Sequence, residues 1–177
     1  HQKIINGTAT YEAVDGIHNA KVSELSSNEY HVELTMRDIL SYKLNDDSLL
    51  IDTGSPHYVK KVDDLENLDI INKGAAIRYD KSISDDGVNV DFLLNKDGVI
   101  RIRTYERGVE NETLACGTGV TASAIAASLW FGGDNIDIYT QIAKLNVRFQ
   151  KENNTFRNVV LSGPATHVFD GIFIFAK

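Results

Sequence analysis

The sequence predicts an α+β protein in which a β-sheet wraps around one buried helix. The first observation is a long stretch without any charged residue between Glu112 and Asp134. Within it, residues 117–131 are mainly Ala, Ser, Thr, Val, Ile and Leu, and a pair of glycines follows. Ala favours helix and a Gly pair ends one, while the lack of a polar face indicates burial. The second observation is ten or more short segments with the pattern of strands.

The predicted strands lie on both sides of this helix in the sequence. Alternating or short apolar runs bounded by turn residues mark segments 10–14, 17–25, 30–36, 49–53, 58–62, 88–94, 99–105, 136–140, 145–150, 157–161 and 168–175. Asp-Gly pairs, which are strong turn signals, precede several of them. We expect residues 95–98 to close a hairpin and residues 162–165 to form a tight turn.

Two further segments are expected outside the strands. A surface helix is predicted over residues 65–79, with Asp63 or Asp64 as its N-cap. Residues 54–57 contain a proline, which fixes an extended conformation before it and removes one N–H donor. We expect a stiff loop there, and loops on rigid scaffolds often carry function.

Composition narrows the class of protein. The 177 residues fit one domain or slightly more, and the apolar fraction of 42% is ordinary for a globular chain. A net charge of −7 argues against nucleic acid or an anionic membrane as a partner. A membrane span is disfavoured, because hydroxyl residues interrupt the uncharged stretch and acids flank it. One cysteine excludes an internal disulfide and fits a reducing cytosol. The chain begins with His1 rather than Met, so we interpret it as processed, partial or incompletely recorded.

Cys116, the only cysteine, stands where the predicted buried helix begins. The first turn of a helix has free N–H groups and a partial positive charge. A thiol at such a place ionises more readily, and the same N–H groups suit a carboxylate. Gly117 and Gly119 let a ligand approach the backbone closely. Two interpretations follow: a reactive thiolate acting on an amino or hydroxy acid, or a buried and inert cysteine.

Polar residues elsewhere favour the reactive interpretation. Glu106 and Arg107 follow a predicted strand, and Arg offers a planar fork for a carboxylate while Glu binds an ammonium. Adjacent opposite charges are, however, normally a solvated surface pair. Asn89 falls inside a predicted strand, where Asn is unfavourable, which indicates a specific partner for its amide. His57 lies in the stiff loop, although a lone His is more often structural than catalytic.

Several of these residues belong to one long and specific signature. It consists of Tyr105-Glu106-Arg107-Gly108-Val109 and Glu112-Thr113-Leu114-Ala115-Cys116-Gly117-Thr118-Gly119, with Gly54-Ser55-Pro56-His57, Gly87-Val88-Asn89-Val90 and Gly163-Pro164-Ala165 in the same order. This signature resembles that of the diaminopimelate epimerase family, and the resemblance extends from about Tyr11 to the C-terminus. It implies a cytoplasmic isomerase that interconverts LL- and meso-diaminopimelate for lysine and peptidoglycan synthesis, using two cysteines and no cofactor.

The resemblance also implies a domain organisation. The family has two similar lobes, each a barrel-like mixed β-sheet wrapped around a central buried helix, with the substrate between them. Residues 38–167 would be the second lobe, with its central helix at 117–131. Residues 1–37 would be strands remaining from the first lobe, completed by residues 168–177. The segment with the first lobe's catalytic cysteine is expected to be absent. The chain alone is therefore expected not to epimerise, and to exchange the substrate's α-hydrogen from one face only.

The resemblance assigns roles to the site residues. Cys116 would accept or donate the proton, and His57 and Glu106 would tune the cysteines. The residues that would hold the amino-acid end of the substrate are Ser55, Asn89, Glu106, Arg107, Gly117 and Thr118. Ser55 departs from the family, which usually has Asn there, and a hydroxyl offers fewer hydrogen bonds than an amide. No metal site is expected. The implied partner is diaminopimelate, and a homodimer is compatible with the sequence.

Three alternatives remain open at this stage. The first is a related isomerase acting on proline, hydroxyproline or another acid, which the long signature disfavours. The second is a carboxylate-binding lobe without turnover, which the incomplete start favours. The third is a hydrolase in which Cys116 and His57 form a nucleophile and base. A carboxylate-recognising Arg107 beside the cysteine makes the third alternative weaker.

Overall fold

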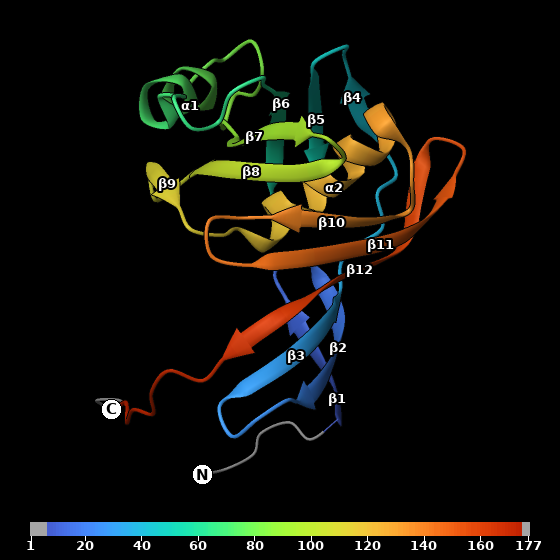
Figure 1. Ribbon diagram of the computed structural model, residues 1–177, viewed down its shortest axis with the longest axis vertical. Coiled ribbons are helices and arrows are strands. Elements are labelled where there is room, and N and C mark those ends of the chain that lie inside the picture. Colours follow the sequence, from blue (N-terminus) through green and yellow to red (C-terminus); the bar gives the residue numbers. More distant parts are fainter. Residues whose placement is uncertain (1–6, 175–177) are drawn as a thin grey trace.

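The protein is built on a single mixed β-sheet and two helices. The computed structural model describes residues 7–174. Within that range the strands are β1 (Gly7–Ala13), β2 (Gly16–Glu24), β3 (Glu29–Thr35), β4 (Tyr42–Leu44), β5 (Ser48–Asp52), β6 (Pro56–Lys61), β7 (Asn89–Lys96), β8 (Val99–Glu106), β9 (Asn111–Thr113), β10 (Asn135–Tyr139), β11 (Lys144–Glu152) and β12 (Thr155–Thr166). The helices are α1 (Ile70–Arg78) and α2 (Gly117–Phe131). The expected α+β class is confirmed, and Figure 1 shows the arrangement.

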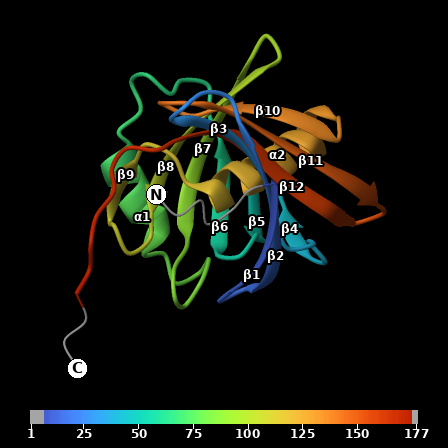
Figure 2. The ribbon, with the colours of Figure 1, turned by 90° about the horizontal axis from the view of Figure 1, so that it is seen from below.

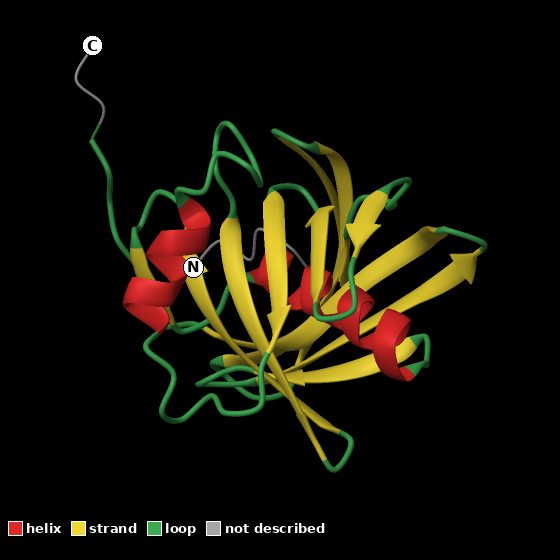
Figure 3. Cartoon of the chain, turned by 90° about the horizontal axis from the view of Figure 1, so that it is seen from above, coloured by secondary structure: helices red, strands yellow, loops and turns green. Residues whose placement is uncertain are grey.

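Neighbouring strands of the sheet follow the order β1-β2-β3-β12-β11-β10-β8-β7-β6-β5-β4, and β9 pairs with β8. All pairs are antiparallel except β6 with β7 and β8 with β10. Parallel strands need a long crossover connection, and each of these two crossovers contains one helix. Helix α1 lies between β6 and β7 in the chain, and α2 lies between β8 and β10. Figure 3 shows both helices against the strands.

Helix α2 is buried because its sequence has no polar side to expose. The ten residues from Gly119 to Ser128 are all buried. The helix has the bounds predicted from the sequence, and Gly132, with φ of 92°, ends it in a conformation that favours glycine. It contacts strands β5, β6, β7, β8, β10 and β11, and Figure 2 shows it between β5–β7 and β10–β11.

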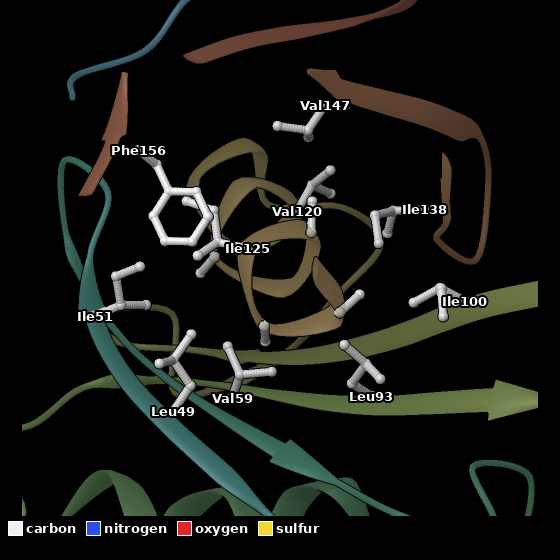
Figure 4. Packing of buried hydrophobic residues seen from close by; sticks show 14 of the residues in the cluster. Leu49, Ile51, Val59, Leu93, Ile100, Val120, Ile125, Ile138, Val147 and Phe156 are labelled. Atoms are coloured by element: carbon white, nitrogen blue, oxygen red, sulfur yellow. The ribbon is translucent and has the colours of Figure 1, made fainter. Parts of the chain in front are cut away.

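The main hydrophobic core surrounds this helix. Figure 4 looks along α2, with Val120 and Ile125 of the helix facing side chains from several strands. The strand residues labelled around it are Leu49, Ile51, Val59, Leu93, Ile100, Ile138, Val147 and Phe156. Each buried aliphatic side chain stabilises the fold by roughly 1.5–3 kcal/mol relative to an exposed one. The start of α2, where Cys116 stands, is therefore held by a packed core.

Helix α1 is shorter than the sequence predicted and begins later. Asp69 is its N-cap, and the carboxylate of Asp69 accepts a hydrogen bond from the N–H of Asn72 at 3.1 Å. The expected cap at Asp63 or Asp64 was wrong. Asp64 instead accepts from the N–H groups of Glu66 and Asn67, which closes a local turn before the helix. Behind α1 lies a second cluster of buried residues, formed by Leu65, Ile70, Val88, Val90, Phe92 and Tyr105.

Two other expectations about particular segments were wrong. Residues 162–165 form no turn but lie inside β12, where they pair with β3. Pro164 is tolerated there because β11 pairs with β12 only up to Ser162, which leaves one edge of the strand open. His57 belongs to β6 rather than to the loop before it. The remaining segments, β4 and β9, have three residues each and gave no clear strand signal.

The last predicted strand, 168–175, does not form over its described residues. Residues 167–174 have no regular secondary structure. Thr166 pairs with Glu29, the first residue of β3, so β12 has no further partner beyond that point. Beyond it, the backbone N–H of His167 donates to the carbonyl of Asn28 at 2.9 Å. Expectations for residues 1–6 and 175–177 lie outside the described range.

Strands β1, β2 and β3 form the part of the sheet that extends away from both helices (Figure 1). Among the strands of residues 7–174, these three connect to the rest of the sheet through the pairing of β3 with β12. The main core around α2 draws on residues from Ile39 to Val159, so it lies outside these three strands. Over the described residues, neither helix has the length and apolar character needed to cross a membrane.

Candidate active site

Three elements meet at the start of α2 and bring the candidate residues together. The loop from β5 to β6 carries Ser55, and β6 and β7 run parallel with His57 beside Asn89. The first turn of α2 then lies directly against this pair of strands. A Cβ atom on Gly119 would come 3.2 Å from Cε1 of His57, so only glycine permits this approach. The parallel pairing and the glycine together place His57 beside the helix N-terminus.

Cys116 occupies the N-cap position of α2. Its backbone is extended, with φ of −128° and ψ of 114°, and its carbonyl accepts the N–H of Val120 at 2.8 Å. The N–H groups ahead of Val120 in the first turn have no acceptor within the helix. The thiol is half-buried, and its sulfur lies 3.3 Å from Oγ1 of Thr118. The sulfur is thus at the surface end of the helix, next to unpaired amides.

Two hydroxyl groups and the His57 ring form a cluster beside this sulfur. Oγ1 of Thr118 lies 2.9 Å from Nε2 of His57 and 3.1 Å from Oγ of Ser55. Oγ of Ser55 also lies 3.0 Å from Nε2 of His57. A second contact fixes Thr118 itself, because its carbonyl accepts the hydroxyl of Thr53 at 2.8 Å. The thiol, Thr118 and His57 therefore form a continuous line of polar contacts.

Asn89 joins this cluster to the loop that carries Arg107. The Asn89 amide nitrogen donates to Oγ of Ser55 at 3.1 Å and to the carbonyl of Pro56 at 3.0 Å. The Asn89 amide oxygen accepts the backbone N–H of Arg107 at 2.9 Å. The Arg107 guanidinium donates to the carbonyl of Gly87 at 3.2 Å. The partner that the sequence indicated for Asn89 is thus a set of three groups, from Ser55, Pro56 and Arg107.

Glu106 and Gly117 complete the residues singled out from the sequence. Glu106 ends β8 and is half-buried, and its carbonyl accepts the N–H of Glu110 at 2.8 Å. Among the described residues, no hydrogen bond joins the Glu106 carboxylate to the cluster around Cys116. Gly117 is the first residue of α2 and is exposed. The structure therefore brings Ser55, His57, Asn89, Thr118 and Cys116 into contact, with Arg107 attached through its backbone.

Sequence reasoning missed the carboxylate behind His57. Asp91 lies two residues beyond Asn89 on the same face of β7, and its Oδ2 lies 2.7 Å from Nδ1 of His57. The other oxygen accepts the hydroxyl of Thr104 at 2.7 Å. An Asp inside an otherwise apolar strand is as unfavourable as the Asn that the sequence analysis did single out. The same signal would have found Asp91.

The Asp91 carboxylate controls the charge of His57. Complete burial by itself lowers the pKa of the imidazole. The charge and the hydrogen bond of Asp91, together with the neighbouring Cys116, oppose this effect and raise the pKa of His57 from 6.5 to about 9. At neutral pH the ring is therefore a cation that faces the hydroxyl of Thr118, whose oxygen also lies against the sulfur.

This raised pKa predicts a loss of stability at alkaline pH. Below pH 6.5 His57 is protonated in both the folded and the unfolded chain, so the stabilisation is fully present. As the pH rises through about 9 the folded chain loses this proton, and the free energy of unfolding is expected to fall by about 3 kcal/mol. Urea unfolding at a series of pH values measures the fall.

The matched variant for this experiment is His57→Gln, which removes the titrating group. The pKa of His18 is also raised, by a hydrogen bond to the carbonyl of Thr35 and by Asp15, and it changes stability in the same direction. The difference between the two proteins therefore isolates His57. If the free energy of unfolding of His57→Gln changes with pH between 6.5 and 9 as much as that of the unmodified chain does, the raised pKa does not belong to His57.

Within residues 7–174, no group of three or more His, Cys, Asp or Glu side chains has the arrangement of a metal site. The start of α2 instead offers amide N–H groups and a thiol, and the backbone of Arg107 is bonded to the same cluster through Asn89. Such a set suits a carboxylate that is held near a proton donor or acceptor. The arrangement is therefore chemically suited to moving a proton on a small anionic molecule.

Comparison with known proteins gives a family and several relatives. A family model described as Diaminopimelate epimerase matches residues 49–168. The diaminopimelate epimerase of Flavobacterium psychrophilum is 42% identical over 170 residues, which cover 94% of this chain and 65% of that protein. The one of a Hydrogenobaculum species is 47% identical over 127 residues, covering 69% of this chain and 44% of that protein. The chain thus spans less than two thirds of each relative.

Solved structures with a similar fold include two proteins of low sequence identity. A phenazine biosynthesis protein of the PhzF family from Bacillus anthracis has a TM-score of 0.63 and 11% identity, covering 96% of this chain and 70% of that one. A protein described as a predicted epimerase from Pseudomonas aeruginosa has a TM-score of 0.60 and 11% identity, covering 95% of this chain and 70% of that one. At such identities the likeness concerns the fold alone.

Proposed function

Since the chain belongs to the diaminopimelate epimerase family, we propose that it carries one half of the active site of an isomerase that interconverts LL- and meso-diaminopimelate. The observation that supports this most directly is the Cys116 sulfur at the N-terminus of α2, 3.3 Å from Thr118. The reaction needs no cofactor in this proposal, and it serves lysine and peptidoglycan synthesis in the cytoplasm.

In the proposed reaction the carboxylate of the substrate binds at the start of α2. The N–H groups of Gly117 and Thr118 face the carboxylate, and the positive end of the helix stabilises the charge that develops when the α-hydrogen leaves. The Arg107 fork binds the same carboxylate, while Glu106 holds the ammonium group. Asn89 and Ser55 supply further hydrogen bonds at this end of the substrate. These contacts strengthen as the carbanion forms, which lowers the barrier.

Inversion at a carbon atom requires a base on one face and an acid on the other. Cys116 supplies one of the two groups, as a thiolate that removes the α-hydrogen or as a thiol that returns a proton. We propose that a second cysteine, from a segment outside these 177 residues, supplies the other. The two cysteines exchange roles when the direction of the reaction reverses.

This proposal fits a two-lobe organisation. Residues 38–167 then form one barrel-like lobe around α2 as its central helix. Residues 1–37, together with 168–177, belong to the other lobe. The extension of β1, β2 and β3 away from both helices supports such a division. The substrate lies between the lobes, next to Cys116.

Hydrogen exchange at the α-carbon tests the proposed function. The 177-residue chain, and a longer chain with any residues that its reading frame encodes before His1, are each incubated with LL-diaminopimelate in D₂O. The short chain is expected to introduce deuterium without changing the configuration, and the longer chain to produce the meso isomer. Mass spectrometry and chiral chromatography measure the two outcomes. If neither chain introduces deuterium, the proposal is wrong. Deuterium in proline or hydroxyproline, but not in diaminopimelate, would instead identify a related racemase.

A further inference from the structure

Asp91 is a charged residue in the centre of the protein that the reaction described above does not use. Its side chain and that of His57 are both completely inaccessible to solvent. Burying a carboxylate in a strand among apolar residues is costly unless it is paired and hydrogen-bonded. Both oxygens are paired here, one with Nδ1 of His57 at 2.7 Å and the other with the Thr104 hydroxyl at 2.7 Å. The Asp91 carboxylate is therefore placed to hold the imidazole ring of His57 in one orientation.

The contact with Asp91 determines which nitrogen of His57 carries a proton. A carboxylate oxygen only accepts hydrogen bonds, so the short contact requires a proton on Nδ1. The opposite nitrogen, Nε2, then faces the hydroxyl oxygens of Thr118 and Ser55 at 2.9 and 3.0 Å. The ring is thus fixed between Asp91 on one side and the first turn of α2 on the other.

The protonation of Nε2 sets the direction of the hydrogen bonds that reach the sulfur. If Nε2 carries a proton, it donates to Thr118, and the Thr118 hydroxyl is free to donate to the sulfur 3.3 Å away. If Nε2 is bare, the Thr118 hydroxyl donates to the ring instead and the sulfur loses this bond. A cationic His57 therefore favours a thiolate at Cys116, both by its charge and by this orientation of Thr118.

The close packing of α2 makes the arrangement rigid. A Cβ atom on Gly119 would lie 2.4 Å from Oδ1 of Asp91, so the helix backbone touches the carboxylate directly. The groups facing His57 are Asp91 from β7, Cys116 from the N-cap of α2, and the uncharged Ser55, Asn89 and Thr118. Asp91 is thus the one anion, apart from the thiolate itself, that the ring meets in the described structure.

We propose that Asp91 is a positioning residue for the reaction, which fixes the His57 ring so that His57 and Thr118 support the thiolate form of Cys116. The raised pKa of His57, about 9, agrees with this geometry, because it keeps the ring cationic at neutral pH. The inference rests on the proposed function in taking Cys116 as the reacting group. It adds a residue of β7 that acts without touching the substrate.

Alkylation of Cys116 tests the inference directly. Because the chain has a single cysteine, the rate of reaction with iodoacetamide reports this thiol alone. In Asp91→Asn, His57 is expected to be neutral at pH 7 and alkylation to be about tenfold slower than in the unmodified chain. At pH 10, which is above the pKa of about 9 of His57 in the unmodified chain, the ring is neutral in both proteins and the rates are expected to agree. A purely structural role for Asp91 would instead change accessibility, and with it the rate at both pH values.

Two further variants keep the test decisive. Thr104→Val keeps Asp91 but removes one of its hydrogen bonds, so we expect alkylation at pH 7 to slow by about two- to threefold. Asp137→Asn, which changes a surface carboxylate paired with Lys144, is the matched control and is expected to leave the rate unchanged. If Asp91→Asn folds, as judged by circular dichroism, and reacts like the unmodified chain at pH 7, the inference is wrong. If Asp91→Asn does not fold, an unchanged rate for Thr104→Val refutes it.

The outcome is separable from that of the proposed function. A chain that exchanges no substrate hydrogen, but whose Cys116 reactivity depends on Asp91, would refute the epimerase proposal and retain the support of the thiol. If the unmodified chain and Asp91→Asn exchange substrate hydrogen equally well and are alkylated at the same rate, the proposed role of Asp91 is refuted and the epimerase proposal is retained.

Discussion

Replacing Cys116 by alanine is expected to abolish exchange of the substrate's α-hydrogen, with a loss of about a thousandfold or more. The half-buried sulfur lies at the open end of α2, and proton transfer by a positioned group contributes about 10² to 10⁴ in rate. Substrate affinity should change only a few-fold, because the helix amides and Arg107 remain. Deuterium incorporation measures the rate, and calorimetry measures the affinity.

Cys116→Ser is the companion variant. A hydroxyl fits the same half-buried position but is far less acidic than a thiol, so its exchange rate should also be very low. Cys116 makes no side-chain capping bond, so Cys116→Ala should change the free energy of unfolding by no more than about 0.5 kcal/mol, while Cys116→Ser adds a capping hydroxyl and should not lower it. An alanine variant that still exchanges hydrogen at a tenth of the original rate would show that another group is the base.

Replacing Arg107 by glutamine is expected to weaken substrate binding about a hundredfold. Arg107 makes no ion pair within the described chain, and its guanidinium uses one donor on the carbonyl of Gly87. The other donors remain available for a carboxylate, and a planar two-point contact of this kind is worth several kcal/mol when it is shielded from water. Titration of the variant with diaminopimelate by calorimetry gives the dissociation constant.

Two other variants show whether the guanidinium itself is responsible. Arg107→Lys retains the charge without the planar fork, so it should recover only part of the affinity. Arg101→Gln changes an exposed arginine on β8, the strand that leads to Arg107, and should have no effect. The backbone N–H of residue 107 still binds Asn89 in each Arg107 variant, which keeps the loop in place. A glutamine variant that binds as tightly as the original chain would refute the assigned role.

The sequence predicted those elements whose signal is local. The bounds of α2 followed from an uncharged, Ala-rich run ending in two glycines, and the structure has the same bounds. The hairpin of β7 and β8 followed from Asn95 to Gly98, where Asp97 and Gly98 both have positive φ. In each case the residues that specify the structure lie within the element or beside it.

Elements that depend on distant partners were not predictable in this way. The end of β12 is set by where β3 begins, more than a hundred residues earlier in the chain. The proline at 164 marks a turn in most sequences, but here one open edge accommodates it. The start of α1 depends on a choice between three aspartates, and the local turn around Asp64 decides it.

The residues of the candidate site also fall into those that a local sequence signal indicated and those that only the pairing of distant strands brings together. Cys116, Arg107 and Asn89 stood out because of their position in a motif or their poor fit to a strand. Asp91 fits a strand as poorly as Asn89 does, but nothing in the sequence indicates that β7 and β8 present Asp91 and Thr104 to His57. The parallel pairing of β6 with β7 creates that contact, and it is a property of the whole sheet.

Strand β12 is shared by the two parts of the sheet. Val160, Leu161 and Ser162 are each paired with β11 on one edge and with β3 on the other. If β1, β2 and β3 rotated about these three residues of β12 relative to the rest of the protein, the hydrogen bonds to β11 or to β3 would break. Directly after these three residues comes Gly163, which pairs with β3 alone and has no side chain. Any reorientation of the smaller part is therefore expected to pivot after Ser162, leaving the strands around α2 undisturbed.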